Sequence, residues 1–399
     1  MNVFILTKEP FPNGMAATNR IKCLAKAFLS AGVNCKVVIF RKNKLNDQYK
    51  SVGFYDGVPY EYITDSLRQR GDRFFGYISF LILQMKLLLY LRKTLNKGDF
   101  VYGFLGTENL LRKCIIKIVH KRGGYYISEL CEYPFGTGKE STIVDLQRKY
   151  ALKKLFPLFD GVVAISNALF LLAQKYCSQK CEIINVPILV DYDKYDLPDN
   201  SINVSQPFIF HSGTLTEQKD GILGAIEAFG IAVNRIEKKI HFIIAGKKES
   251  SPHLNEINEL LNKYNIRSRV HFIGYLPYEK LKKPLSEASL VVLNKYPTQQ
   301  NHYGFSTKLG EYLAAGKPVI ITRVGEAINW LSDGINAIII EPNNSNLLAN
   351  AIVDAFSNVD KCRRMGQQAK LLCKKSFDYN NYGIVLLGLL NNILDKSKV

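Results

Sequence analysis

Hydrophobic and polar positions follow two different periods along this chain. Short apolar runs, such as residues 2–7 and 318–322, are separated by longer stretches in which apolar residues recur every three or four positions. The short runs are typical of buried strands, and the longer spacing is typical of helices with one apolar face. The pattern therefore predicts an α/β protein in which strands and helices alternate.

The predicted elements form two successive series. In the first half we expect strands over residues 2–7, 35–40, 58–63, 99–104, 124–130, 161–166 and 181–186, and helices over 17–31, 73–96, 108–121 and 141–156, with a short helix between the last two strands. In the second half we expect strands over 207–213, 240–246, 269–274, 289–294, 318–322 and 336–342, and helices over 217–235, 254–264, 278–286 and 306–315, followed by several helices from about 345 to 397. Each series predicts a doubly wound parallel sheet, and together they predict two Rossmann-like domains that face a cleft.

A change of composition marks the boundary between the two series. Residues 191–206 lose the apolar periodicity and collect Asp, Asn, Ser and Pro, so we interpret them as a linker. We therefore expect an N-terminal domain of residues 1–190 and a C-terminal domain of residues 207–377, with a helix over about 378–397 packing back on the N-terminal domain. A chain of 399 residues with 47% hydrophobic content is long enough to give both domains a core.

Positive charge is concentrated in the first half of the chain. Of the net charge of +18, residues 1–190 carry +14, with 28 Lys/Arg against 14 Asp/Glu. This asymmetry favours a polyanionic partner for that half, either an anionic membrane surface or nucleic acid, over the alternative of a merely soluble basic surface.

Other features of the sequence favour a cytoplasmic protein. The start of the chain lacks the pattern of a signal peptide, and the apolar stretch 73–95 is interrupted by Gln84 and Lys86, so we do not expect it to span a membrane. Its apolar and basic residues suit either a membrane surface or a buried helix of the first domain. The eight cysteines are scattered, which favours free thiols in a reducing compartment.

Candidate chemistry appears at the start of the predicted helix 306–315. Lys308 lies in its first turn, where the helix dipole disfavours a cation, and Glu311 follows one turn later on nearly the same face. Ser306 or Thr307 can cap the helix. The plain alternative is a surface ion pair. Because this helix precedes a buried strand, its start is expected at the carboxyl edge of a sheet, where anionic ligands bind.

Five motifs in register resemble a known family. They are "HSGTLTEQKDGILGAIEAF", "HFIIAG", "RVHFIGYLPYEKLKKPLSEASLVVL", "YGFSTKLGEYLAAGKPVI" and "GINAIIIEP". In this order they resemble the C-terminal half of family 4 retaining glycosyltransferases of GT-B fold, of the type that builds bacterial surface polysaccharides. The likeness covers nearly all of residues 207–357 and extends more loosely to the N-terminal half.

The resemblance implies a site for a nucleotide diphosphate sugar in the C-terminal domain. Lys219 and Lys308 would stabilise the departing diphosphate, and Glu311 would bind the ribose hydroxyls. The plain alternatives are a solvated lysine at a helix start and an exposed helix charge. The donor-binding set implied by the motifs is Gly14, Gly213, Thr214, Lys219, Tyr303, Gly304, Phe305, Ser306, Thr307, Lys308, Leu309 and Glu311.

The sequence departs from the family pattern at three positions. Tyr303 stands where the family often has a glutamate that contacts the donor sugar, and Thr214 stands where many members have a phosphate-binding arginine. Only Gly14 is present where two glycines are common in the loop after the first strand. These differences leave more of the leaving-group stabilisation to Lys219 and Lys308.

Two acidic residues are candidates for the acceptor side of the site. Glu129 and Glu132 end a predicted strand of the first domain near the position of an acceptor-facing residue in the family. Either could orient the acceptor hydroxyl, and the equally weighted alternative is an ordinary solvated loop carboxylate.

The resemblance implies a glycosyltransferase that transfers a sugar with retention from a nucleotide diphosphate sugar to a glycan or lipid-linked acceptor. We expect a cytoplasmic enzyme, peripheral on the inner face of an anionic cell membrane. We expect no cofactor and no essential metal, because the histidines do not form a metal-ligand cluster. Two alternatives stay open: a GT-B nucleotide-sugar epimerase, and a non-catalytic nucleic-acid-binding protein, although no nucleic-acid module accompanies the charge and no nucleic-acid partner is expected.

Overall fold

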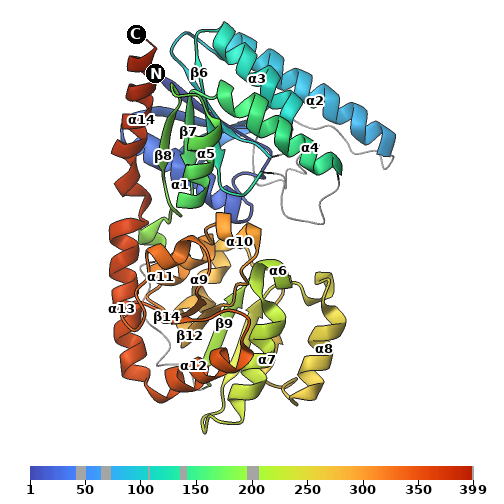
Figure 1. The fold of residues 1–399 in the computed structure, drawn as a ribbon, viewed down its shortest axis with the longest axis vertical. Helices are drawn as coiled ribbons and strands as arrows, with labels where there is room; N and C mark the ends of the chain where they lie inside the picture. Colours follow the sequence, from blue (N-terminus) through green and yellow to red (C-terminus); the bar gives the residue numbers. More distant parts are fainter. Residues whose placement is uncertain (42–50, 64–72, 107, 135–141, 196–205, 398–399) are drawn as a thin grey trace. The chain divides into compact units, whose positions relative to one another are not determined.

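The protein divides into two compact α/β units (Figure 1). The computed structural model describes residues 1–41, 51–63, 73–106, 108–134, 142–195 and 206–397. The first unit comprises Met1–Leu189 and Tyr379–Val399, and the second comprises Val190–Asp378. Each unit contains one largely parallel sheet, so the α/β class predicted from the periodicity is confirmed.

The sheet of the first unit has eight strands. Their order is β3-β4-β2-β1-β5-β6-β7-β8, and every neighbouring pair is parallel except β3 with β4. The strands are β1 (Asn2–Thr7), β2 (Asn34–Ile39), β3 (Val52–Tyr55), β4 (Val58–Tyr62), β5 (Phe100–Phe104), β6 (Tyr125–Leu130), β7 (Gly161–Ala164) and β8 (Glu182–Asn185). The chain reverses its direction of strand addition between β1 and β5, and such switch points are where α/β sheets bind ligands.

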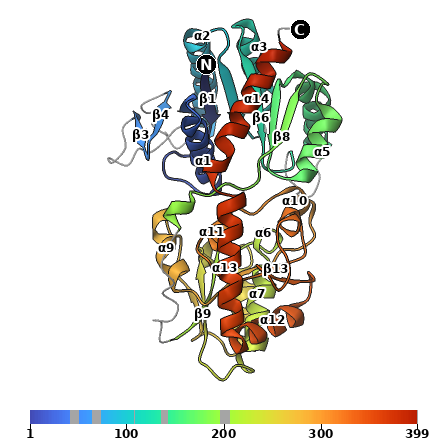
Figure 2. The same ribbon diagram turned by 90° about the vertical axis from the view of Figure 1, so that its left-hand side faces the viewer.

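Helices from both ends of the chain cover this first sheet. They are α1 (Ala16–Ser30), α2 (Arg73–Thr94), α3 (Asn109–Lys121), α4 (Thr142–Tyr150), α5 (Asn167–Tyr176) and α14 (Gly383–Lys396). The last of these lies against α1 and β8, as Figure 2 shows. Its buried side chains recur at helical spacing and join the core of the unit: Leu386, Leu389, Leu390 and Ile393. The end of the chain thereby becomes part of the first hydrophobic core.

Helix α2 is attached to the first unit by one apolar face. Leu83, Leu87 and Leu91 are buried at a spacing of four residues, whereas Leu81 and Met85 on another face are exposed. Part of its apolar surface is therefore not needed for folding. Within the described residues, no helix combines the length and the apolar character that crossing a membrane requires.

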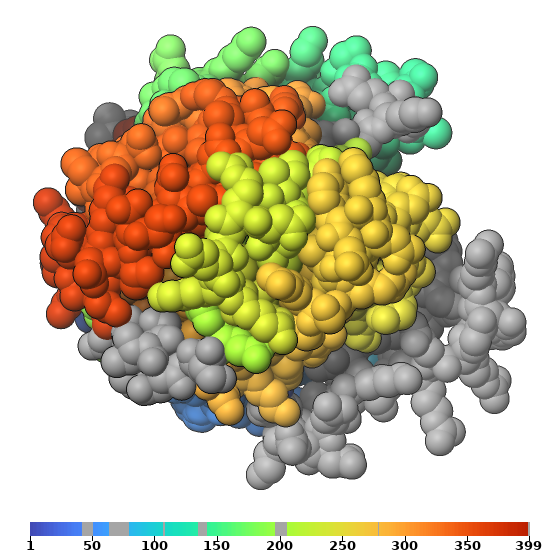
Figure 3. Space-filling view, turned by 90° about the horizontal axis from the view of Figure 1, so that it is seen from below, coloured from blue at the N-terminus to red at the C-terminus, as the bar shows by residue number. Residues whose placement is uncertain are grey.

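The sheet of the second unit has six parallel strands in the order β11-β10-β9-β12-β13-β14. The strands are β9 (Phe208–Ser212), β10 (His241–Ala245), β11 (Val270–Phe272), β12 (Leu290–Leu293), β13 (Val319–Thr322) and β14 (Ile338–Ile340). The helices are α6 (Glu217–Asp220), α7 (Ile222–Val233), α8 (Leu254–Lys263), α9 (Tyr278–Glu287), α10 (Gln299–Tyr303), α11 (Thr307–Ala314), α12 (Ser345–Ser357) and α13 (Val359–Ser376). Helix α7 lies between α8 and α12, and Figure 3 shows these three helices from outside. The switch point of this sheet lies between β9 and β12.

Several elements differ from the sequence prediction. The helix expected over 217–235 is two helices, because Gly221 adopts a left-handed conformation with φ of 56°. The helix expected over 141–156 ends at Tyr150 and continues as a π turn. Strand β3 and helix α10 were not predicted. The hairpin of β3 and β4 turns at Asp56 and Gly57, both with positive φ, a dipeptide that favours such turns.

A buried charge network ties α1 to the first sheet. Arg20 Nε donates to Glu129 Oε1 at 2.5 Å, and its terminal nitrogens donate to the carbonyls of Pro187 and Val186 at 2.6 and 3.0 Å. The second carboxylate oxygen of Glu129 accepts a short hydrogen bond from the hydroxyl of Tyr102. Burial and the adjacent Glu129 raise the pKa of Tyr102 well above its ordinary value, so this hydroxyl stays a donor.

We expect the substitution Arg20→Ala to destabilise the first unit by about 3–5 kcal/mol, because it leaves the Glu129 carboxylate buried and without its cation. Amide hydrogen exchange of residues 100–104 and 125–130 should accelerate accordingly. The fluorescence of Trp330, the single tryptophan of the sequence, reports the second unit and serves as an internal reference.

The matched control is Arg363→Ala, which removes an arginine from an exposed pair with Asp360. Its effect should stay within about 0.5 kcal/mol, as is usual for surface ion pairs. Unchanged exchange protection of β5 and β6 in the Arg20 variant would show that the network does not stabilise the unit.

Candidate functional site

The candidate site lies at the carboxyl ends of β9, β12 and β13, at the switch point of the second sheet. The loop after β9 holds Gly213 and Thr214, and the loop after β12 begins with Asn294 and Lys295. Thr322, at the end of β13, accepts from the Lys295 amide at 2.8 Å and donates to the Lys295 carbonyl at 2.6 Å. Strand order therefore brings together loops that are about 80 residues apart in the sequence.

Asp220 is the buried centre of this site, and the sequence analysis did not single it out. Its Oδ2 accepts from the Thr214 amide at 2.8 Å, the Thr214 hydroxyl at 3.0 Å and the Leu215 amide at 3.2 Å. Its Oδ1 forms a short ion pair with Nζ of Lys308. One carboxylate thus joins the loop after β9, helix α6 and helix α11.

Gly213 is required by this close packing. A Cβ atom at this position would lie 2.5 Å from Asp220 Oδ2 and 2.7 Å from Lys308 Nζ. Both distances are shorter than van der Waals contact, so any larger residue would displace the ion pair. The Asp220–Lys308 contact therefore leaves no room for a side chain at position 213, which explains why the motif has a glycine there.

Lys219 lies on the short helix α6. Side chains from the loop after β12 and from α10 hold the backbone carbonyls of α6 and of Gly221, which follows it. Asn294 Nδ2 donates to the Gly221 carbonyl at 2.8 Å, and Lys295 Nζ donates to the Lys219 carbonyl at 2.8 Å. Asn301 Nδ2 donates to the Gln218 carbonyl at 3.0 Å. Three side chains therefore fix the turn that presents Lys219, whose own side chain is exposed.

The electrostatics of the site are set by Lys308 and Lys295 next to Asp220, and by Lys219 next to Lys295. Burial acts to raise the pKa of Asp220, but Lys308 and the other nearby positive groups outweigh it and lower that pKa well below its ordinary value. Burial, together with Lys308 and Lys219, lowers the pKa of Lys295 to about 8. Positive charge at this edge of the sheet exceeds what Asp220 neutralises, so the site favours an anion.

His211, on β9, contributes a neutral polar group to the same region. Burial and the charge of Lys308 lower its pKa to about 4. Its Nδ1 lies 3.1 Å from the Val292 carbonyl, and its buried Nε2 has no hydrogen-bond partner among the described residues. The neutral tautomer with a proton on Nδ1 fits this contact.

Helix α11 carries the second predicted lysine and the predicted glutamate. Ser306 occupies its N-cap position but makes no side-chain capping hydrogen bond, so the expected cap by Ser306 or Thr307 is not formed. Glu311 is buried, with 8% of its surface exposed, and the carboxylate that pairs with Lys308 is Asp220. The amides of the first turn of α11 are thus not capped by the Ser306 side chain.

The remaining predicted donor residues surround the start of α11. Tyr303 ends α10, Gly304 links the two helices, and the buried ring of Phe305 packs against Phe377 with centroids 5.8 Å apart. Leu309 is fully buried. Phe305 and Leu309 therefore position the helix through the core, whereas Tyr303 and Gly304 are half-buried.

Gly14, Glu129 and Glu132 belong to the first unit. Gly14 lies in the turn before α1, where a Cβ would overlap the Thr18 hydroxyl that donates to the Pro10 carbonyl. Glu129 is not a solvated loop residue, because its side chain is 1% exposed and bonded to Arg20 and Tyr102. Glu132 is exposed, so it is the better candidate of the two for contact with an acceptor.

Sequence reasoning missed Asp220, Lys295 and Asn301. Asp220 directly follows Lys219, which the motifs had already singled out. Lys295 directly follows the strand predicted over 289–294, and a residue at the carboxyl end of a parallel strand lies at the edge of the sheet where ligands bind. Their pairing depends on loops that meet only in the folded sheet. In the described part of the chain, no group of His, Cys, Asp and Glu side chains is arranged to hold a metal ion.

Comparison with known proteins places this site in a family. Residues 195–372 match the family model described as glycosyl transferases group 1. The uncharacterized glycosyltransferase MJ1069 of Methanocaldococcus jannaschii is 22% identical over 237 residues, which cover 57% of this chain and 57% of that protein. The chain spans only about a third to somewhat over half of the length of the curated relatives it matches.

Solved structures match the whole chain at low identity. Sucrose-phosphate synthase from Thermosynechococcus elongatus superposes with a TM-score of 0.74 at 15% identity, covering 99% of both chains. The Anabaena protein HepE, solved with UDP and glucose, superposes with a TM-score of 0.73 at 16% identity, covering 98% of this chain and 99% of its own. The resemblance and the fold predicted from the motifs are confirmed: residues 195–372 match the group 1 glycosyltransferases, family 4, and the chain has the GT-B fold.

Proposed function

We propose that this protein transfers a sugar from a nucleoside diphosphate sugar to an acceptor, with retention of configuration at the transferred sugar. The observation that carries the proposal is the cluster of Lys219, Lys295 and Lys308 beside the first turn of α11, in which Lys308 pairs with Asp220 and Lys295 lies next to both Lys308 and Lys219. Fixed cations and helix amides stabilise the charge that develops on a departing diphosphate.

Each group in the cluster has a role in this proposal. Lys219 and Lys308 act on the leaving diphosphate, and the carboxylate of Glu311 accepts hydrogen bonds from the ribose hydroxyls. Lys295 positions the Lys219 turn and adds positive charge. As in retaining relatives, leaving and attacking groups would share one face of the sugar, and the departing phosphate would take the proton of the acceptor hydroxyl.

A UDP-sugar is the first donor to test, because the HepE structure contains UDP and glucose. We assign the acceptor to the first unit and propose a glycan or lipid-linked acceptor of surface polysaccharide synthesis. The positive charge of residues 1–190 supports a cytoplasmic protein that is peripheral on an anionic membrane. Glu132 is the candidate residue for orienting the acceptor hydroxyl. We propose no essential metal and no nucleic-acid partner.

The nucleotide preference tests the donor site directly. We expect UDP to raise the thermal unfolding temperature of the second unit more than ADP or GDP does, because a ligand that binds only the folded state stabilises it. Glu311→Gln should weaken nucleotide affinity by about 5- to 150-fold, equivalent to about 1–3 kcal/mol, since an amide binds two hydroxyls less strongly than a carboxylate.

The control for this substitution is Glu341→Gln, at an exposed position that pairs with Arg323. It should leave the affinity unchanged. If none of the three nucleotides stabilised the protein, the donor site would be wrongly assigned; if Glu311→Gln bound UDP like the unaltered protein, Glu311 would not contact the ribose.

The two predicted cations should affect turnover more than binding. Lys219→Ala and Lys308→Ala should each lower kcat by about 10- to 100-fold while changing KM for the donor much less, because their interaction strengthens as the diphosphate departs. Release of UDP from a UDP-sugar with an acceptor measures both parameters. Interconversion of the sugar without an acceptor would instead identify an epimerase.

The control is Lys238→Ala, which removes an exposed lysine of the same unit. It measures how far the loss of any one positive charge changes kcat. Wild-type turnover at saturating donor in both the Lys219 and Lys308 variants would contradict their assignment to the leaving group.

Donor affinity should also depend on pH through Lys295. Its pKa of about 8 means that the cation is present below pH 8 and is lost above it, so UDP affinity should fall as the pH rises from 7 to 9. One linked proton limits the slope to about tenfold per pH unit. Calorimetric titration with UDP across this range measures the slope.

Lys295→Met should flatten this dependence and weaken binding at pH 7, whereas Lys295→Arg should flatten it while keeping affinity at pH 9, because arginine stays charged. His211, with a pKa of about 4, does not titrate in this range. An unaltered slope in the Met variant would assign the pH dependence to another group.

A further inference from the structure

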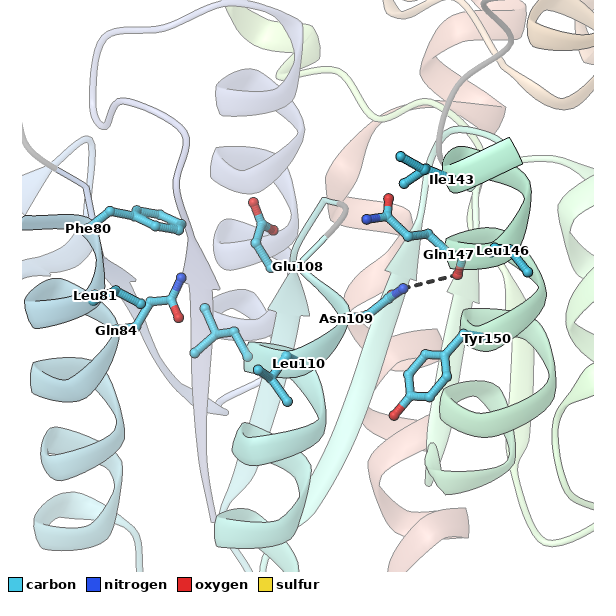
Figure 4. Close-up of a pocket in the computed structure, with 11 residues that line it drawn as sticks. Phe80, Leu81, Gln84, Glu108, Asn109, Leu110, Ile143, Leu146, Gln147 and Tyr150 are labelled. Atoms are coloured by element: carbon cyan, nitrogen blue, oxygen red, sulfur yellow. Dashed lines mark hydrogen bonds between the residues drawn. The ribbon is translucent and has the colours of Figure 1, made fainter. Parts of the chain in front are cut away.

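The first unit contains an open groove that the donor chemistry does not use. It has a volume of about 590 Å³ and is lined by side chains of α2, α3, α4 and the residue before α3. Figure 4 shows Phe80 and Gln84 from α2 across from Leu110, with Ile143 and Leu146 on α4. A hydrogen bond of 3.0 Å from Asn109 to the Gln147 carbonyl links α3 to α4. We call this feature the α2–α4 groove.

The rim of the α2–α4 groove is apolar and exposed. Leu110 is 76% exposed, Ile143 is 67% exposed and Leu146 is 59% exposed. On α2, the exposed residues Leu81, Met85 and Leu89 follow one another at a spacing of four, so they form a stripe on one helical face. Exposed apolar side chains gathered in this way mark an interaction surface rather than a part of the core.

The helices that form the groove are strongly basic. Residues 73–94, 109–121 and 142–155 contain 12 Lys/Arg and a single acidic residue, Asp145. The exposed cations among them include Lys86, Lys117, Lys149, Lys153 and Lys154. This charge complements a surface that is densely anionic. Nucleic acid would satisfy the charge, but it would leave the exposed leucines and isoleucine in water, so the combination favours anionic lipid.

The groove extends to the ligand-binding edge of the first sheet. Lys8, directly after β1, forms a short ion pair with Glu108, which lines the groove. The Lys8 ammonium also lies 5.6 Å from the centre of the Phe80 ring. Because β1 and β5 flank the switch point of this sheet, a molecule seated in the groove lies next to the expected acceptor position.

We propose that the α2–α4 groove is the docking surface of this protein for an anionic phospholipid bilayer. Acyl chains would contact Leu110, Ile143 and Leu146, and the surrounding cations would contact headgroup phosphates. This docking surface extends the proposed function and rests on one part of it, the lipid-linked acceptor. Docking here would bring such an acceptor to the first sheet. It is independent of the donor site.

Vesicle co-sedimentation of the full chain tests this docking surface. The protein should bind vesicles of phosphatidylcholine with phosphatidylglycerol, bind vesicles of phosphatidylcholine alone much more weakly, and lose most of its binding in high salt. Leu110→Glu should lower the partition coefficient on the anionic vesicles by about tenfold or more, because it replaces an inserted apolar side chain by a repelled carboxylate. Leu110→Ser, which adds no charge, should lower it by a smaller factor.

The matched control is Ile384→Glu, which places the same charge at an apolar position that is 82% exposed on α14 of the same unit. It should bind vesicles like the unaltered protein. Amide hydrogen exchange protection of β5 and β6 should be unchanged in every variant, which shows that the first unit is folded. Stabilisation by UDP should also be unchanged and shows that the second unit is folded.

Three outcomes would overturn the proposal. One is no binding of the unaltered protein to anionic vesicles at low salt, and another is equal binding of the Leu110→Glu and Ile384→Glu variants. The third is a dimer in sedimentation velocity that Leu110→Glu dissociates, since a second copy would then cover the groove. Loss of UDP binding with vesicle binding retained would refute the donor site and leave the docking surface standing.

Discussion

The ion pair between Lys308 and Asp220 is the interaction on which the rest of the second unit's site depends. Asp220 is buried, and its charge is tolerated because Lys308 and the amides of Thr214 and Leu215 all point at it. These contacts fix the start of α11 against the loop after β9. They also explain Gly213, since any side chain there would occupy the space of the ion pair.

The second unit gathers more positive charge at this sheet edge than its own carboxylate neutralises. Lys295 is half-buried beside Lys219 and Lys308, and its pKa is lowered first by burial and then by the charges of these two cations. Backbone carbonyls of residues 218–221 partly compensate for this by accepting hydrogen bonds from Lys295, Asn294 and Asn301. A bound diphosphate would relieve the repulsion, which is why crowded charges of this kind are typical of functional sites.

The first unit uses its charges in two different ways. Inside, Arg20 and Glu129 neutralise each other and fasten α1 to the sheet, so they belong to the fold. Outside, the cations of α2, α3 and α4 surround exposed apolar side chains such as Leu110. The positive charge of this half of the chain is therefore partly localised around one apolar groove.

The sequence by itself determined the alternation of strands and helices, because apolar periodicity is a local property of each segment. It also singled out Lys219 and Lys308 as candidate cations, because they fall near the starts of predicted helices and match the family motifs. The sequence did not fix every element boundary. The left-handed Gly221 divides one predicted helix in two, and the Asp56-Gly57 turn that joins β3 to β4 was not predicted.

The tertiary structure alone decided which side chains meet. Glu129 was one of two candidates for orienting an acceptor hydroxyl, yet a hydrogen bond from Arg20, 109 positions away, places it in the core. Asp220 and Lys308 are 88 positions apart, and Lys295 reaches the Lys219 carbonyl across 76. These contacts exist because β12 lies next to β9 in the sheet, and strand order is set by packing across the whole unit rather than by any local pattern.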